Sequence, residues 1–167
     1  GSTSIKSIKA KPIIDIAVGT DDFNRILSHE AELLKAGYHY RPNHDMCGAQ
    51  LLFACGSYYE GGDMRTHFIH VVKYNSMEWR NYINFRDYLN TYPEIAKQYE
   101  KVKTRLVEKL GSMGSRNDYV DGKAEFISHT LRKAMVWSFL GKTVTMKTDR
   151  PLGYVHRKSG YELVYPL

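Results

Sequence analysis

A single carboxylate, Asp15, lies in the middle of an apolar run, residues 12–18 (PIIDIAV). This run is short, rich in Ile and bounded by Pro and Gly, which predicts a buried β-strand. A carboxylate is costly to bury unless it is paired, binds a metal ion or faces a cleft. Asp15 is therefore the first candidate for a catalytic or metal-binding residue. The alternative is a structural carboxylate satisfied by a Lys, an Arg or a nearby backbone amide.

Two histidines, His67 and His70, lie in a second strand-like run, residues 66–72 (THFIHVV). Side chains alternate between the two faces of a regular strand, so residues three apart point to opposite sides. Joint metal binding by this pair would require a β-bulge. We predict that one histidine faces Asp15 and that the other is structural. The sequence does not distinguish them, so both are candidate catalytic residues.

A small turn and a lysine next to the Asp15 strand could bind an anion. Ser2 and Thr3 follow Gly1, and such a turn can present backbone amides and hydroxyl groups to a phosphate. Lys11 immediately precedes the strand and could reach the same phosphate; the alternative is a solvated lysine. Gly-Ser pairs are common in turns, so the prediction of phosphate contacts rests on their position beside Asp15.

Arg86 lies within the apolar stripe of a predicted helix, between Ile83 and Leu89. A guanidinium on a buried helix face needs a carboxylate or a phosphate as its partner. We predict either an anion-binding arginine or a structural salt bridge to a carboxylate such as Asp15. The neighbouring Asp87 points to one side of the helix and is predicted to be a poor partner.

Strands precede helices along the chain, which predicts an α+β fold. Asp21 or Asp22 can cap the first helix, Ser76 the second, and Pro93 takes the favoured first position of the third. Tyr38, Tyr40, Tyr58 and Tyr59 are predicted to lie in loops. The predicted strands are residues 12–18, 51–54 and 66–72, and the predicted helices are residues 22–35, 77–91, 93–110 and 119–137.

Composition narrows the class of protein. The 167 residues carry 24 Lys plus Arg, 18 Asp plus Glu and 43% hydrophobic residues, which fits one packed domain. Basic and acidic residues alternate, so nucleic acid is not an expected partner. No segment approaches the ~20 apolar residues that span a bilayer. Cys47 and Cys55 lack the paired spacing of a zinc site, and a reduced, buried Cys55 predicts a cytoplasmic protein.

The character of the chain changes near Gly141. Residues 142–148 and 161–165 each alternate as a strand, and a turn-like segment lies between them. We expect residues 139–167 to be the incomplete opening of a second, β-rich domain. This tail resembles the start of inorganic-pyrophosphatase-like proteins, which implies a phosphate contact for Arg150.

An ordered set of motifs runs along most of the chain: 1–4 (GSTS), 10–16 (AKPIIDI), 37–38 (GY), 66–72 (THFIHVV), 85–89 (FRDYL), Tyr99, Lys103, Tyr119 and Lys123. Together they resemble the GrpB-like proteins over about residues 1–138. The resemblance implies a nucleotidyltransferase-like fold, in which helices flank a mixed β-sheet, and a domain that begins before Gly1. Members occur alone or joined to dephospho-CoA kinase, so a fused enzyme domain is an expected partner.

The wider nucleotidyltransferase superfamily uses a Gly-Ser turn for nucleotide phosphates and two carboxylates, spaced Asp-x-Asp/Glu, for magnesium. Ser2 and Asp15 match this pattern, which implies Mg²⁺ as a cofactor held by Asp15. Ala17 stands where the second carboxylate would be. A two-metal site for phosphoryl transfer needs several oxygen ligands around each cation. The resemblance therefore implies nucleotide binding and leaves nucleotidyl transfer open.

These observations predict a protein that binds a nucleotide or another phosphorylated small molecule. The expected cleft is lined by Ser2, Thr3, Asp15, His70 and Arg86, with Lys11 helping Arg86 to balance the phosphate charge. The alternative is a non-catalytic accessory domain that supports folding or assembly of a fused enzyme. This alternative predicts that Arg86 pairs with Asp15 and that no open polar cleft remains.

Overall fold

The structure is a computed structural model that describes residues 1–42, 49–57, 64–111 and 116–141. The predictions for Cys47, Tyr58, Tyr59 and residues 142–167 lie outside this part of the chain. The described residues form a short 3₁₀ turn, four strands and five helices. In chain order they are η1 (Ser2–Ser4), β1 (Ile14–Thr20), α1 (Phe23–Leu27), α2 (Glu30–Lys35), β2 (Tyr38–Tyr40), β3 (Gln50–Ser57), β4 (Met64–Lys73), α3 (Met77–Thr91), α4 (Pro93–Leu110) and α5 (Arg116–Phe139).

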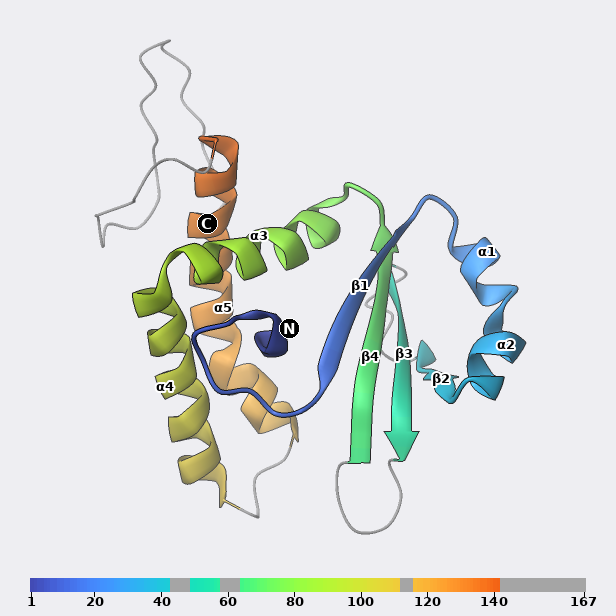
Figure 1. Ribbon diagram of the computed structural model, residues 1–167, viewed down its shortest axis with the longest axis horizontal. Helices are drawn as coiled ribbons and strands as arrows, with labels where there is room; N and C mark the ends of the chain where they lie inside the picture. The colour runs from blue at the N-terminus through green and yellow to red at the C-terminus, as the bar shows by residue number, and fades with distance from the viewer. Residues whose placement is uncertain (43–48, 58–63, 112–115, 142–167) are drawn as a thin grey trace.

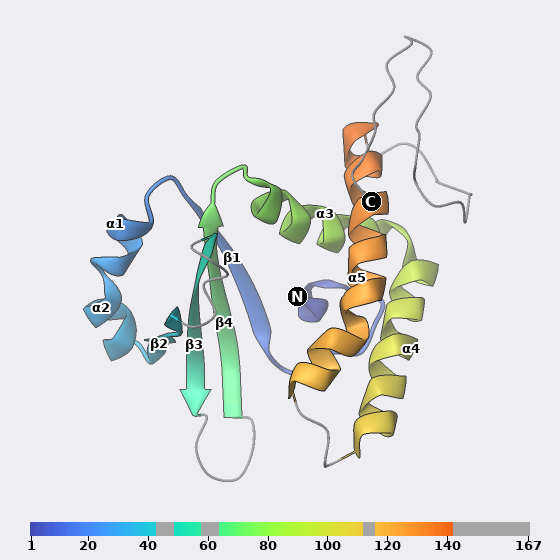
Figure 2. The same ribbon diagram turned by 180° about the vertical axis from the view of Figure 1, so that it is seen from behind.

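The four strands form one mixed sheet in the order β1-β4-β3-β2. β1 runs parallel to β4, while β3 pairs antiparallel with both β4 and β2. Helices α1 and α2 lie on one side of the sheet, and α3, α4 and α5 lie on the other (Figures 1 and 2). The predicted α+β fold with a mixed sheet and flanking helices is therefore confirmed.

Each side of the molecule has its own hydrophobic core. On one face of the sheet, Leu51, Phe53 and Val71 are buried beneath side chains of α1 and α2. The helical side is built around Trp137, which is 2% exposed and packs with buried residues of α3 and α4. Ile5, just after η1, is also buried in this helical core. The N-terminal turn is thereby anchored between the helices and the sheet, as both views show (Figures 1 and 2).

Local capping signals explain where most helices begin. The hydroxyl of Ser76 accepts a hydrogen bond from the backbone N–H of Trp79 at the start of α3. Pro93 takes the first turn of α4, where its missing N–H leaves no helical bond unmade. The carboxylate of Asp22 accepts from the N–H of Asn24 and caps α1. The predicted capping residues are therefore the ones that the structure uses.

The single helix predicted over residues 22–35 is wrong, because the structure divides it into α1 and α2. The break falls at Ser28 and His29. The hydroxyl of Ser28 donates to the carbonyl of Arg25, which competes with continued helical bonding. Two short helices can then follow the twisted sheet that they cover.

Tyr38 and Tyr40 were predicted to lie in a loop, and the structure places them in β2. This strand pairs with β3, and Tyr38 lies opposite Cys55. Cys55 is a free thiol that is half-buried, rather than fully buried as the sequence predicted. Among the described residues, no helix combines the length and apolar character needed to cross a bilayer.

Candidate functional site

The parallel pairing of β1 with β4 places Asp15 and His70 on the same face of the sheet. Asp15 lies opposite Phe68, and His70 lies opposite Ala17, so all four side chains share this face. His70 Nε2 lies 3.6 Å from Asp15 Oδ1. This distance is too long for a hydrogen bond, so the contact acts through charge when the imidazole is protonated. Both side chains remain partly exposed, at 29% for Asp15 and 20% for His70.

The two histidines point to opposite faces, as their spacing predicted. His67 lies opposite Ile14 in β1, and its ring meets the edge of the Tyr38 ring. Its Nδ1 lies 2.9 Å from the hydroxyl of Thr66. The structure therefore brings His70, and not His67, to Asp15. His67 has the structural surroundings that the sequence predicted for one member of the pair.

The N-terminal turn closes over Asp15 so tightly that it requires a glycine. A Cβ atom at Gly1 would lie 2.7 Å from the Cβ of Asp15 and closer still to its carboxylate. The nitrogen of Gly1 lies 3.7 Å from Asp15 Oδ2. Any side chain at position 1 would therefore force either Asp15 or the N-terminal turn to move.

Asn90 of α3 holds this turn in position. Its side-chain carbonyl accepts from the N–H of Lys6, and its amide donates to the carbonyl of Ser4. The same amide also reaches the carbonyl of Arg86 in the preceding helical turn. One side chain thus connects the N-terminal segment to α3, a connection that no local sequence pattern indicates.

A cavity of about 500 Å³ opens beside Asp15, between the sheet and the helices. This volume lies within the range of small-molecule sites, roughly 300–1,000 Å³. The lining combines ionisable groups with the rings of Tyr82, Phe85 and Tyr99. The polar groups that bear on the chemistry are Ser2, Asp15, His70, Glu78, Arg86 and Lys123.

The surroundings of Asp15 favour its charged form. Burial alone would raise the pKa of this carboxyl, but the adjacent His70 opposes burial most strongly, and the pKa is lowered. Burial, with the nearby charges of Asp15 and Glu78, raises the pKa of Tyr82 to about 12. The neutral Tyr82 hydroxyl donates to Gln50 Oε1 at 3.2 Å. The cavity therefore offers the charged carboxylate of Asp15 together with the neutral phenol of Tyr82.

Acidification is expected to destabilise the protein partly through Asp15. The pKa of Asp15 is lower in the folded state than in the unfolded chain, so the unfolded chain binds the proton more readily. The contribution of Asp15 is therefore present above about pH 4 and is lost as the pH falls through the lowered folded value. Urea unfolding of the wild type and of Asp15→Asn at pH 5 and pH 3 measures this effect. The variant should lose less stability over that interval; equal losses would contradict the assignment.

Arg86 lines the same cavity, but the prediction about its partner is wrong. Its Nη2 and Nε atoms lie 2.7 Å and 2.8 Å from Asp87 Oδ1. The predicted burial of Arg86 is also wrong, since its side chain is 44% exposed. Adjacent helical residues do not face each other at the backbone, but the long arginine side chain turns back to reach Asp87. Arg86 thus lines the cavity while it pairs with Asp87, and Asp15 lies beside His70.

Thr3 and Lys11 lie outside this cavity. The hydroxyl of Thr3 donates to the carbonyl of Ile13 at 3.3 Å. Lys11 extends over the ring of Tyr119, with its Nζ 5.6 Å from the ring centre, and lines a different hollow. Of the predicted phosphate contacts, the structure brings Ser2 and Arg86 to Asp15 and does not bring Thr3 or Lys11.

Lys123 lines the cavity, although the sequence analysis named it only among the matching family segments and gave it no role in the site. It is half-buried and holds its Nζ 5.0 Å from the centre of the Tyr119 ring. The four-residue spacing of Tyr119 and Lys123 puts them on one side of α5, which is a usable signal. Lys123 and Asp15 lie far apart in the sequence, so no local pattern indicates that both line the same cavity. Tyr82 and Asn90 were missed for the same reason.

The donor set around Asp15 is small for a metal centre. Among the described residues, no group of three or more His, Cys, Asp and Glu side chains could hold a metal ion. Ala17, two residues after Asp15 on the same face, contributes no oxygen. Mg²⁺ is commonly held by one or two carboxylates together with substrate phosphates. Asp15 could serve as a protein carboxylate of such an arrangement.

Comparison with known proteins places residues 1–133 in the family described as "GrpB protein". The chain is 38% identical over 134 residues to "Glutamate-rich protein GrpB" of Alkalihalophilus pseudofirmus, covering 80% of this chain and 75% of that protein. It is 30% identical over 137 residues to "UPF0157 protein YqkA" of Bacillus subtilis, covering 82% of this chain but 38% of that protein. Neither name states an activity.

The fold has a counterpart among solved structures. The crystal structure of conserved protein GrpB from Enterococcus faecalis superposes with a TM-score of 0.70 and 27% sequence identity, covering 83% of this chain and 79% of that chain. These comparisons support the resemblance seen in residues 1–138. They do not support the likeness of the tail to pyrophosphatase-like proteins, because the family match ends at residue 133.

Proposed function

The chain belongs to the GrpB family, and from the geometry of its cavity we propose that it binds a phosphorylated small molecule, with a nucleotide as the first candidate. The observation that carries the proposal is the cavity of about 500 Å³ with Asp15 and His70 at its base. A partly buried carboxylate beside an imidazole is suited to hydroxyl groups of a sugar, since both side chains accept or donate hydrogen bonds.

The charges at the cavity suit an anionic group next to that polar centre. Arg86 and Lys123 line the cavity together with the hydroxyl-bearing Ser2. Guanidinium and ammonium groups are the usual protein partners of phosphate. In this proposal Ser2, Arg86 and Lys123 contact phosphate, while Asp15 and His70 contact a hydroxyl group. A magnesium ion would enter with the phosphates and use Asp15 as its protein carboxylate.

The accessory-domain alternative is less well supported. It predicted an ion pair between Arg86 and Asp15 and a filled space around them. Arg86 instead pairs with Asp87, and both Arg86 and Asp15 line an open cavity. A purely structural role does not require an acidic group in a hollow of this size. Cytoplasmic location and fusion to an enzyme stay predictions.

Thermal melting with a panel of phosphorylated compounds tests the proposal. The panel includes AMP, ATP and ribose 5-phosphate, each with Mg²⁺ and with a chelator. A ligand present at a hundred times its Kd should stabilise the fold by about 2.7 kcal/mol. Asp15→Asn should abolish the shift with AMP and with ribose 5-phosphate, whereas Asp21→Asn, which removes the same charge at an exposed position before α1, should keep it. No shift with any compound, or equal shifts in both variants, would overturn the proposal.

A further inference from the structure

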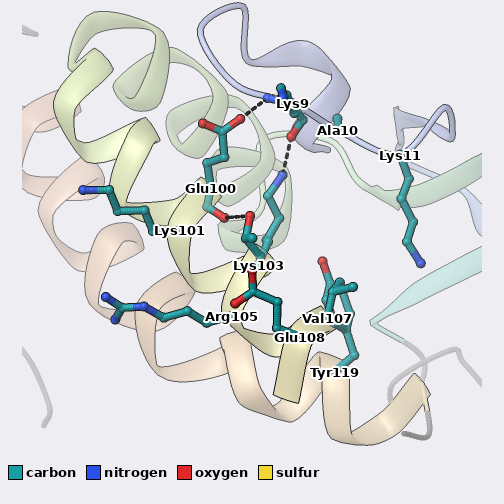
Figure 3. A pocket seen from close by; sticks show the side chains of 11 residues that line it. Lys9, Ala10, Lys11, Glu100, Lys101, Lys103, Arg105, Val107, Glu108 and Tyr119 are labelled. Atoms are coloured by element: carbon teal, nitrogen blue, oxygen red, sulfur yellow. Dashed lines mark hydrogen bonds between the residues drawn. The ribbon is translucent and has the colours of Figure 1, made fainter. Parts of the chain in front are cut away.

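A second hollow, of about 700 Å³, lies next to the cavity on the outer side of α4. Its walls are the segment of residues 9–11 and the exposed face of α4, and Tyr119 of α5 forms part of its lining. Figure 3 shows Lys103 reaching across from α4 to the backbone of Lys9. We call this hollow the lysine groove. Its basic lining residues are Lys9, Lys11, Lys101, Lys103 and Arg105.

The charge of the lysine groove differs from that of the cavity. The groove lining includes five basic residues and two acidic ones, Glu100 and Glu108, and the side chains of Lys101 and Arg105 extend away from Lys11 and Lys103 (Figure 3). Lys9, Lys11 and Lys103 then outnumber the two carboxylates by one. In the cavity, Arg86 and Lys123 are balanced by Asp15 and Glu78. An excess of one sign of charge in a hollow concentrates the opposite charge there, so the groove attracts an anion more strongly than the cavity does.

One of the two acidic residues of the groove is already engaged. Glu100 accepts hydrogen bonds from the Lys97 ammonium, at 2.9 Å, and from the backbone N–H of Lys9 (Figure 3). These two contacts lower the pKa of Glu100. The carboxylate of Glu100 therefore serves to fix residues 9–11 against α4. In this arrangement it shapes the wall of the groove while its charge is shared with Lys97.

Lys103 is held in place rather than loosely solvated. Its Nζ donates to the carbonyl of Lys9 at 2.9 Å and lies 5.0 Å from the centre of the Tyr99 ring. Burial lowers the pKa of Lys103. An ammonium group has three donors, so a bond to one carbonyl does not exhaust it. Such a fixed, half-buried ammonium loses less side-chain entropy on binding an anion than a mobile surface lysine does.

Two tyrosine rings connect the groove with the cavity. Tyr99 lines the cavity, and Lys103 above it lines the groove. Tyr119 lines the groove and lies under both Lys11 and Lys123, of which Lys123 lines the cavity. Positive charge thus continues from the cavity past Tyr119 into the groove. A sufficiently long ligand that binds at Asp15 would therefore also contact the basic side chains of the groove.

We propose that the lysine groove binds the distal phosphates of the same ligand whose polar portion occupies the Asp15 cavity. This inference rests on the proposed function and narrows it to elongated ligands that carry two or more phosphates. The excess of positive charge in the groove, the fixed position of Lys103 and the two tyrosines between the hollows support this assignment. In this inference Lys11 and Lys103, rather than the Gly1-Ser2 turn, make the strongest phosphate contacts.

Isothermal titration calorimetry with inorganic tripolyphosphate measures anion binding to the groove, because this compound has no sugar to occupy the Asp15 cavity. Tripolyphosphate should bind the wild type, more weakly at higher salt. Lys11→Ala and Lys103→Met should each weaken it about threefold or more, and Asp15→Asn should not weaken it. Lys35→Ala, at an exposed position of α2 on the other side of the sheet, should leave binding unchanged. No binding, or binding that Lys11→Ala and Lys103→Met do not alter, would overturn the inference.

A comparison of AMP with ATP tests whether the two hollows act on one ligand. ATP should bind the wild type at least tenfold more tightly than AMP, and the ratio should approach one in a Lys11→Ala/Lys103→Met variant. If the ratio of ATP affinity to AMP affinity is unchanged in this variant, the inference is overturned. The proposed function would still hold in that case, provided that AMP binding depends on Asp15. If tripolyphosphate binds but no nucleotide binding depends on Asp15, the proposed function is overturned. The inference that one ligand occupies both hollows is then overturned as well. Circular dichroism of each variant confirms that the fold is retained.

Discussion

Replacing Trp137 with alanine is expected to lower the free energy of unfolding by about 3–5 kcal/mol, the usual cost of removing a buried tryptophan. Trp137 is 2% exposed and belongs to the core that joins α3, α4 and α5. Its ring meets the edges of Tyr88 and Tyr92, with centres 5.5 Å and 6.1 Å apart. A loss of this size is a large fraction of the stability of a small domain.

Urea unfolding followed by circular dichroism measures this loss. Phe139, two residues later in the same helix, is 54% exposed and serves as the control. Its replacement by alanine should cost about 1 kcal/mol or less, because little apolar surface is withdrawn from water there. Similar losses for the two variants would show that Trp137 does not organise the helical core.

Replacing Gly1 with valine is expected to weaken binding in the Asp15 cavity at least tenfold, which corresponds to about 1.4 kcal/mol. The added side chain would occupy the place of the Asp15 carboxylate, since even a Cβ atom comes within 2.7 Å of the Asp15 Cβ. Asp15 would have to leave His70, or the N-terminal turn would have to lift from the sheet. Either movement removes the polar centre of the cavity.

The direct measurement is the NMR chemical shift of the His70 ring, which requires no ligand. It should move in Gly1→Val because the negative charge 3.6 Å away is displaced. Thr3→Val is the matched control, since the Thr3 hydroxyl meets the Ile13 carbonyl outside the cavity. An unchanged His70 resonance in Gly1→Val, together with unchanged ATP binding, would contradict the close packing of Gly1 on Asp15.

Much of the fold could be predicted from local sequence signals. Helices α3 and α4 begin and end where Ser76, Pro93 and the apolar spacing indicate. The odd separation of His67 and His70 correctly placed them on opposite faces. These features depend on residues within a few positions of one another, so a single sequence contains the information.

The errors arose where distant segments or long side chains decide the outcome. β2 has three residues and exists because it pairs with β3, which composition does not reveal. The apolar stripe of α3 predicts that Arg86 is buried, but its flexible side chain reaches solvent and pairs with Asp87. Lys123 enters the cavity because α5 packs against α3, over a separation of about a hundred residues from Asp15. The presence of Ser2, His70 and Arg86 near Asp15 was predictable, and the contributions of Tyr82, Asn90 and Lys123 were not.

The position of the cavity between two separately packed cores has a mechanical consequence. One wall belongs to the sheet, through Asp15 and His70, and the other belongs to α3, α4 and α5. A molecule bound there would contact both the sheet and the helices α3, α4 and α5. Its affinity would therefore depend on the orientation of the sheet relative to these helices. Occupancy should then suppress slow amide exchange in strand β4 and helix α3 together, because the bound molecule would contact both walls.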